Sequence, residues 1–142
     1  MEAVAIAEEF LRTEKIDVSK GVLLIAEFKE REPAVWHITW VLADGRVDVW
    51  VSQDGSAKLN RGRSSPRILP KKSLMEAAAI AEEFLRAQKI DASKQVLLKA
   101  EFKIYFINDC ETPFWEIAWG LGDQRVIAWV LQDGSAKLIR AR

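Results

Sequence analysis

The sequence predicts an α+β fold made of two tandem units, each a helix followed by an antiparallel meander. Residues 1–29 return at 75–103 with 23 identities in 29 positions, and residues 36–59 return at 115–138 with 16 identities in 24. Each copy opens with helical spacing of apolar residues and continues with strand-like alternation. We therefore expect a pseudo-two-fold body with a first repeat at 1–59, a linker at 60–74 and a second repeat at 75–142.

The helix of each copy is predicted from apolar residues that recur at steps of three and four. In the first copy these are Ala3, Ile6, Ala7, Phe10 and Leu11, and the second copy repeats all five residue types at 77, 80, 81, 84 and 85. This spacing gives a helix one apolar face. Ser73 followed by Glu76 has the spacing of a capping box, so the second helix is predicted to begin there.

Three or four strands are predicted after each helix. The first copy alternates over 22–30 and 36–42, and Asp44-Gly45 then predicts a hairpin turn before a strand over 46–53. Asp54-Gly55 predicts a second turn before a short strand over 56–59. In the second copy Asp123-Gln124 lacks the glycine, and Gly122 is the alternative turn residue.

One face of the second predicted strand carries large apolar side chains in both copies. They are Trp36, Ile38, Trp40 and Leu42 in the first copy and Trp115, Ile117, Trp119 and Leu121 in the second. Because burial of aromatic side chains stabilises a small domain, we expect this face to form the core under the helix.

Composition indicates a globular protein of one ordinary domain or two very small ones. The 142 residues are 49% apolar and 30% charged, with a formal net charge of zero. No apolar run approaches the roughly 20 residues that span a bilayer, and the first residues lack the pattern of a secretory signal. The single cysteine, Cys110, excludes an internal disulfide. These features favour a cytoplasmic protein without a membrane segment.

Residues 60–74 hold five basic residues, two prolines and no acidic residue. This composition predicts an exposed basic linker. Nucleic-acid binding is disfavoured because no aromatic residue for base stacking is interleaved with the basic ones.

The helix sequence Ile-Ala-Glu-Glu-Phe-Leu-Arg, the Trp-x-Ile-x-Trp strands and the Asp-Gly hairpins resemble the cystatin-like superfold. Within this superfold, the pattern particularly resembles PepSY-type domains and small immunity proteins of nuclear-transport-factor-like fold. Two such units in tandem also resemble the β-lactamase inhibitory proteins, although the disulfides of those proteins are absent here. The resemblance implies a helix across one sheet face and a binding role, as an inhibitor or immunity-type protein.

A partner-binding surface is predicted on the sheet face away from the helix. Trp50 shares that face with Asp48 and Ser52, and the second copy places Ile127, Trp129 and Leu131 there. Three large apolar residues on a nominally exposed face favour contact with another protein or with the other copy. One version of this prediction is a homodimer through the second copy.

The second copy carries five extra residues between Lys103 and Phe114. They fall in a predicted hairpin that contains Tyr105, Phe106 and Cys110. A longer loop with aromatic residues is a candidate recognition element. The alternative is a longer hairpin whose aromatic residues simply extend the sheet.

His37 and Asp48 are predicted to face each other on neighbouring strands and form a possible polar site. The second copy replaces them with Glu116 and Ile127. A cross-strand or surface histidine is therefore favoured over a catalytic one. No catalytic or metal-binding constellation is recognisable, and we expect neither metal nor cofactor.

The sequence thus favours a non-enzymatic binding or protein-interaction module. The alternative is a small enzyme of the isomerase or dehydratase class with a nuclear-transport-factor-like fold. That alternative requires a pocket between helix and sheet that contains a polar pair.

Overall fold

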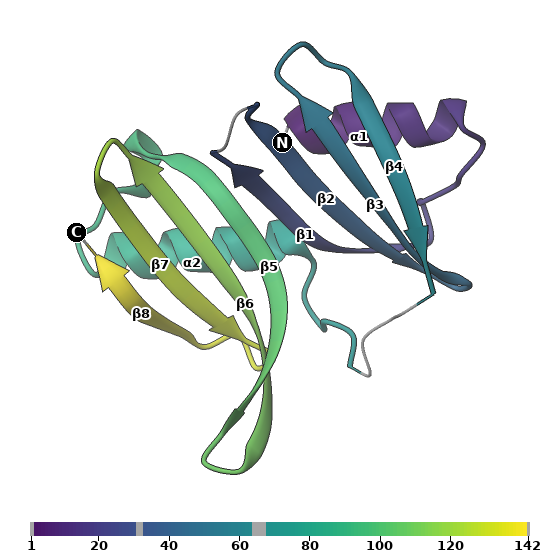
Figure 1. The fold of residues 1–142 in the computed structure, drawn as a ribbon. Coiled ribbons are helices and arrows are strands. Elements are labelled where there is room, and N and C mark those ends of the chain that lie inside the picture. The colour runs from purple at the N-terminus through teal and green to yellow at the C-terminus, as the bar shows by residue number, and fades with distance from the viewer. Residues whose placement is uncertain (1, 31–32, 64–67, 142) are drawn as a thin grey trace. The chain divides into compact units, whose positions relative to one another are not determined.

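The computed structural model describes residues 2–30, 33–63 and 68–141, apart from the side chains of Ser93 and Leu121. The chain divides into two compact units, Met1–Arg67 and Ile68–Arg142, hereafter unit 1 and unit 2 (Figure 1). Among the described residues, each unit has one long helix and four antiparallel strands. The predicted α+β class is confirmed. The predicted symmetry between the units stays a prediction.

Unit 1 begins with its helix and continues as a meander in which each strand pairs with the next. The spatial order is β4-β3-β2-β1. The elements are α1 (Glu2–Thr13), β1 (Val22–Lys29), β2 (Val35–Leu42), β3 (Gly45–Ser52) and β4 (Ala57–Gly62).

Unit 2 repeats this sequence of elements and adds a 3-10 turn. Its spatial order is β5-β6-β7-β8, again antiparallel throughout. The elements are α2 (Leu74–Ala87), η1 (Ala92–Lys94), β5 (Val96–Ile107), β6 (Cys110–Leu121), β7 (Gln124–Leu131) and β8 (Ala136–Ala141). The register shifts between Leu97 and Lys99 in β5, as it does between Leu23 and Ile25 in β1.

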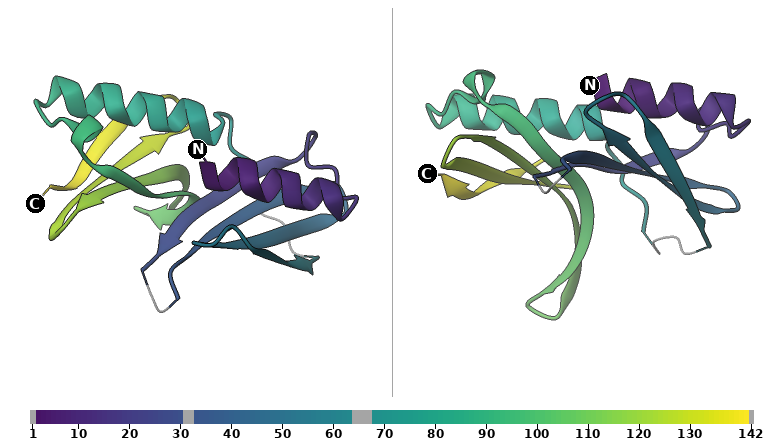
Figure 2. Two further views of the ribbon diagram at one scale, coloured as in Figure 1. Left: turned by 90° about the horizontal axis from the view of Figure 1, so that it is seen from above. Right: turned by 45° about the horizontal axis from the view of Figure 1, so that its top comes forward.

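Each helix covers one face of the strands of its own unit (Figure 2). The apolar stripe of the helix and the alternating apolar residues of the strands meet there and are buried. In unit 1 the buried set includes Ala7, Leu11, Ala26, Ile38, Trp40, Val47 and Val49. In unit 2 it includes Ala81, Leu85, Ala100, Ile117, Trp119, Val126 and Ala128.

The residues predicted to form this core are buried to different extents. Trp40, Trp115 and Trp119 are buried as predicted, whereas Trp36 is only half-buried. Leu42 is also half-buried, and the side chain of Leu121 lies outside the described residues.

The capping box at the start of α2 is confirmed. The Ser73 hydroxyl accepts a hydrogen bond from the Glu76 N–H at 3.1 Å, and the Glu76 carboxylate accepts one from the Ser73 N–H at 2.9 Å. These two contacts satisfy backbone donors that a helix start otherwise leaves unpaired.

The turns and the linker differ in detail from the sequence prediction. The β2–β3 turn uses Ala43 and Asp44, because Gly45 with a φ of 141° is already the first residue of β3. Gly122, with a φ of 61°, forms the β6–β7 turn with Asp123. Strand β4 continues to Gly62, three residues into the predicted linker, because its residues pair with Arg46 and Asp48 of β3.

Residues Ile68–Ser73, here named the entry segment, lead into α2. The Lys71 N–H donates to Oε1 of Gln132 at 3.0 Å, and Nε2 of Gln132 donates to the Leu69 carbonyl at 3.2 Å. The indole N–H of Trp115 donates to the Lys72 carbonyl at 2.9 Å. This part of the predicted exposed linker therefore rests on unit 2. Residues 64–67 of the linker lie outside the described part.

Candidate functional site

Most candidate residues lie on the sheet face opposite the helix in each unit, here named the outer face. Phe106 follows Tyr105 directly in β5 and therefore lies on the opposite face of that strand. In unit 1 this face holds a carboxylate that is almost completely buried, because Asp48 is only 2% exposed. Its Oδ1 accepts a hydrogen bond from the Thr39 hydroxyl at 2.5 Å and lies 2.9 Å from Nε2 of His37. Its Oδ2 accepts a hydrogen bond from Nε of Arg46 at 3.2 Å.

The pKa of Asp48 is below its ordinary value. Burial alone would raise it, because desolvation disfavours the charged carboxylate. Hydrogen bonds from Thr39 and His37 outweigh burial, and the positive charge of Arg46 adds to them. Asp48 is therefore an ionised group whose hydrogen-bonding capacity is used within the unit.

The structure brings together the predicted polar pair His37 and Asp48 and adds Trp50 to it. The rings of His37 and Trp50 are stacked with centroids 4.9 Å apart and an interplanar angle of 5°. Strand pairing explains both contacts, because His37 lies opposite Trp50 and Thr39 lies opposite Asp48 across β2 and β3. The arrangement holds the imidazole in place, and the pairing of β1 with β2 sets Glu27 opposite His37 on its other side.

The outer face of unit 2 has a different carboxylate at its centre. The Glu116 carboxylate forms ion pairs with Lys99 at 3.0 Å and with Lys103 at 3.1 Å. It also accepts a hydrogen bond from the indole N–H of Trp129 at 3.1 Å. Burial would raise the pKa of Glu116, but the contacts with both lysines and Trp129 lower it below its ordinary value. The pKa of Lys99 is raised because its two carboxylate neighbours, Glu116 and Glu101, outweigh its own desolvation.

The predicted apolar patch of unit 2 is less open than the sequence indicates. Ile127, Trp129 and Leu131 are all half-buried. The ring of Trp129 stacks on the buried Phe114 with centroids 4.1 Å apart, and Tyr105 meets Phe114 edge-on at 5.2 Å. These contacts cover part of the patch from within the unit.

The five extra residues of unit 2 lengthen the β5–β6 hairpin rather than forming a loop. Residues 104–113, here named the arm, continue both strands to a two-residue turn at Asn108 and Asp109. Both turn residues have positive φ, 51° and 63°, as a tight hairpin requires. Tyr105 is 44% exposed and Phe106 is 71% exposed. Cys110, beside the turn, is also exposed.

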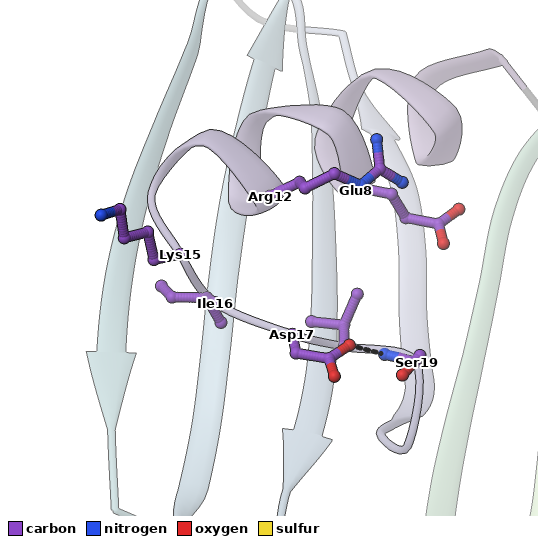
Figure 3. A pocket seen from close by; sticks show the side chains of 7 residues that line it. Glu8, Arg12, Lys15, Ile16, Asp17 and Ser19 are labelled. Atoms are coloured by element: carbon purple, nitrogen blue, oxygen red, sulfur yellow. Dashed lines mark hydrogen bonds between the residues drawn. The ribbon is translucent and has the colours of Figure 1, made fainter.

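A shallow depression lies at the carboxyl end of α1 (Figure 3). Arg12, Lys15 and Asp17 are among its lining residues. Asp17 accepts a hydrogen bond from the Ser19 N–H at 2.9 Å, and Lys15 points away from it (Figure 3). The charged side chains that line the depression do not converge on one point. A binding site for a small polar ligand has convergent polar groups, so the depression is unlike one.

The sequence prediction did not include the cluster around Glu116. Its signal was available in the comparison of the copies, because Lys99 replaces Ile25 and Glu116 replaces His37. Within residues 2–30, 33–63 and 68–141, no group of three or more His, Cys, Asp or Glu side chains is placed to hold a metal ion. In the same ranges no helix has the length and apolar character needed to cross a membrane.

Comparisons with known proteins find remote structural similarity and nothing else. No family model and no curated protein matches the chain. A "putative lipoprotein" from Clostridium difficile 630 is 10% identical with a TM-score of 0.41, and the match covers 96% of this chain and 88% of that one. The YpeB C-terminal domain of Bacillus megaterium is 16% identical with a TM-score of 0.36, and the match covers 98% of this chain and 64% of that one. At these scores neither similarity assigns a function.

Proposed function

We propose that this protein is a non-enzymatic protein-interaction module and that the arm is its recognition element. The supporting observation is the exposure of Phe106, 71%, on a segment that unit 1 lacks. Large aromatic side chains are enriched at protein interfaces, where a few of them supply most of the binding free energy. A partner that covers Phe106 and Tyr105 removes apolar surface that otherwise stays in water.

The arm is also well suited to present these side chains without a large entropy cost. Its strands pair from Ile104 with Pro113 to Ile107 with Cys110, and a two-residue turn closes it. On its base, Tyr105 packs against Phe114 and Trp129. A preorganised binding element loses less conformational freedom when it binds.

The interior of each unit supports this proposal over the small-enzyme alternative. An enzyme of nuclear-transport-factor-like fold requires polar groups between helix and sheet. Among the described residues, those buried between helix and sheet in each unit are apolar. The buried polar residues Thr39 and Asp48 lie on the outer face of unit 1, where the Thr39 hydroxyl donates a hydrogen bond to Asp48.

The outer faces form a second part of the proposed binding surface. Trp50 in unit 1 and Ile127, Trp129 and Leu131 in unit 2 are half-buried, so each retains surface for a partner. A PepSY-like or immunity-type role is the version that the sequence resemblance implies. A homodimer through unit 2 is the version in which the partner is a second copy.

The test is quantitative affinity capture from a lysate of the source cell with wild type, Phe106→Ser and Leu138→Ser. Leu138 is 38% exposed but lies on β8, so it controls for the loss of any exposed apolar residue. We expect at least one protein to be captured by wild type and Leu138→Ser and to be lost with Phe106→Ser. Equal capture by all three variants would contradict the proposal. Sedimentation of the same variants shows whether the captured partner is a second copy.

A further inference from the structure

Trp36 and Trp115 are counterparts in the two copies, but they differ in their partners. The Trp115 indole N–H donates to the Lys72 carbonyl of the entry segment at 2.9 Å, and this side chain is buried. Trp36 is half-buried and packs against Phe28 at 5.5 Å between ring centroids. Within the described part of the chain its indole N–H has no acceptor. A tryptophan with much of its surface buried usually finds a partner for this donor.

A second pair of counterparts shows the same difference. Gln132 holds the entry segment through both ends of its carboxamide, accepting from the Lys71 N–H and donating to the Leu69 carbonyl. Gln53 occupies the same position in unit 1, is exposed, and makes no hydrogen bond with the described residues. Unit 1 therefore has both polar side chains that fix an extended segment in unit 2.

The turn beside this site completes the resemblance and adds charge. In unit 2 the Lys72 side chain lies beside Gly134: a Cβ added to this glycine would be 3.3 Å from Cε of Lys72. Hydrogen bonds from Ser135 lower the pKa of Asp133, and the charge of Lys72 contributes to the same shift. In unit 1 the same turn is Asp54-Gly55-Ser56, and nothing lies within 4 Å of the corresponding position on Gly55.

We propose that Trp36, Gln53 and the Asp54–Ser56 turn, here named the Trp36 seat, bind an extended, lysine-bearing segment of a partner protein. The segment presents one backbone carbonyl to the Trp36 indole and a carbonyl and an N–H to the Gln53 carboxamide. Its lysine lies against Asp54, as Lys72 lies near Asp133. The seat is on unit 1 and uses no arm residue, so this inference goes beyond the proposed function and does not depend on it.

The adjoining surface indicates what else the segment carries. Gly55 and Ser56 also line an apolar groove of about 580 Å³ beside α1, together with Ile6 and Phe10. An apolar side chain next to the lysine of the partner would fill part of this groove. Glu2, which also lines the groove, favours a basic segment over an acidic one, whereas Glu9 is already paired with Arg12.

A second copy of this protein is a poorer occupant than another protein. Its own entry segment already makes these contacts within its own unit 2. Moving that segment to the seat of a neighbour would break one set of contacts to form an equal set, with no gain in bonds. A partner with an unengaged segment gains all of them.

The test uses a capped peptide with the sequence of residues 68–74, Ile-Leu-Pro-Lys-Lys-Ser-Leu, added to the full chain labelled with ¹⁵N at its tryptophan indoles. We expect the Trp36 indole signal to move downfield in a saturable way. Because one net hydrogen bond corresponds to roughly a fivefold change in affinity and Gln53→Ala removes two of them, this variant should weaken binding about 25-fold. Gln132→Ala is the matched control in unit 2, and Phe106→Ser is the control in the arm; both should leave binding at the seat unchanged.

A second experiment tethers the segment to the protein, so that weak binding is also detected. Residues 68–74 are fused ahead of Met1, which raises their effective concentration at the seat to the millimolar range. The Trp36 indole signal should then approach that of Trp115. The proposal is overturned if this signal stays in place in both experiments, or if Gln53→Ala binds the peptide as well as wild type does. A downfield Trp36 signal in the peptide-free protein that is lost on dilution would assign the seat to a second copy and also overturn it.

Discussion

The two units share their helix-facing side but not their outer face. In unit 1 the central carboxylate is Asp48 on β3, with Thr39, His37 and Arg46 around it. In unit 2 it is Glu116 on β6, with Lys99, Lys103 and Trp129 around it. The central carboxylate therefore comes from a different strand in each unit.

This difference between the outer faces teaches that buried polar residues and their partners change together. The counterparts of Asp48 and Thr39 in unit 2 are Ile127 and Ala118, and the counterpart of Lys99 in unit 1 is Ile25. Asp48 or Thr39 placed alone in unit 2 would be a buried charge or donor without its partner, which is costly. The apolar side has no such constraint and stays nearly the same in both copies.

The largest expected effect tests the shared side. Trp40→Ala and Trp119→Ala should each lower the free energy of unfolding by about 3–5 kcal/mol, because each empties a large buried aromatic site. Both tryptophans are buried at equivalent positions. Chemical denaturation followed by circular dichroism measures the change. Near-neutral variants would mean that the helix-facing side is assigned to the wrong face of the sheet.

The next effect separates the two outer faces. Asp48→Ala should cost about 3 kcal/mol, because it leaves Thr39 and Arg46 without their acceptor inside the sheet. Glu116→Ala should cost less, about 1–2 kcal/mol, because Lys99 and Lys103 can turn toward solvent and Lys99 retains Glu101 nearby. The same denaturation experiment measures both. A larger loss for Glu116→Ala would reverse the ranking of the two clusters.

The pH dependence of stability should come in part from the same carboxylates. The folded-state pKa values of Asp48 and Glu116 are lowered, so their contribution is fully present above the ordinary carboxylate pKa near 4. This contribution to stability is lost as the pH falls from the ordinary carboxylate pKa toward the lowered pKa values of Asp48 and Glu116 in the folded protein. Unfolding free energies measured from pH 6 down to pH 2.5 should fall more steeply in wild type than in Asp48→Asn. Identical slopes would show that Asp48 is not held ionised.

The smallest effect compares the two Asp-Gly-Ser turns. Gly55 and Gly134 have φ of 88° and 90°, so Gly→Ala at either should cost about 1 kcal/mol through backbone strain. The Gly134→Ala variant should lose slightly more, because its Cβ meets Lys72 at 3.3 Å. Thermal melts of both variants measure the difference. A greater loss at Gly55 would contradict the seating of Lys72 beside Gly134.

The sequence predicts the parts of this fold that depend on local pattern. Alternation identifies the buried faces of β2 and β6, and the repeated Asp-Gly turns set the order of the strands. The pairing of His37 with Asp48 follows from the same hairpin register. Each of these features depends on residues close together in the chain.

The parts that could not be predicted depend on contacts between distant segments. Trp36 and Trp115 begin the same motif, yet only Trp115 is covered by the entry segment. The contact is between Trp115 and Lys72, which lie 43 residues apart in the sequence, so no local pattern reveals it. The half-burial of Trp129 depends on Phe114, which replaces the smaller Val35. A periodic pattern assigns a side chain to a face but does not reveal what lies over that face.

The register of the arm has an evolutionary consequence. From unit 1 to unit 2 the connection shortens from five residues to two, while each strand gains four, so both strands gain the same number. Equal additions leave the pairing at the base in register, so every residue there stays on its original face. A lineage could therefore lengthen or shorten this hairpin by pairs of residues, and exchange its tip, without refolding the sheet that carries it. The proposed recognition element can therefore change in sequence while the scaffold stays the same.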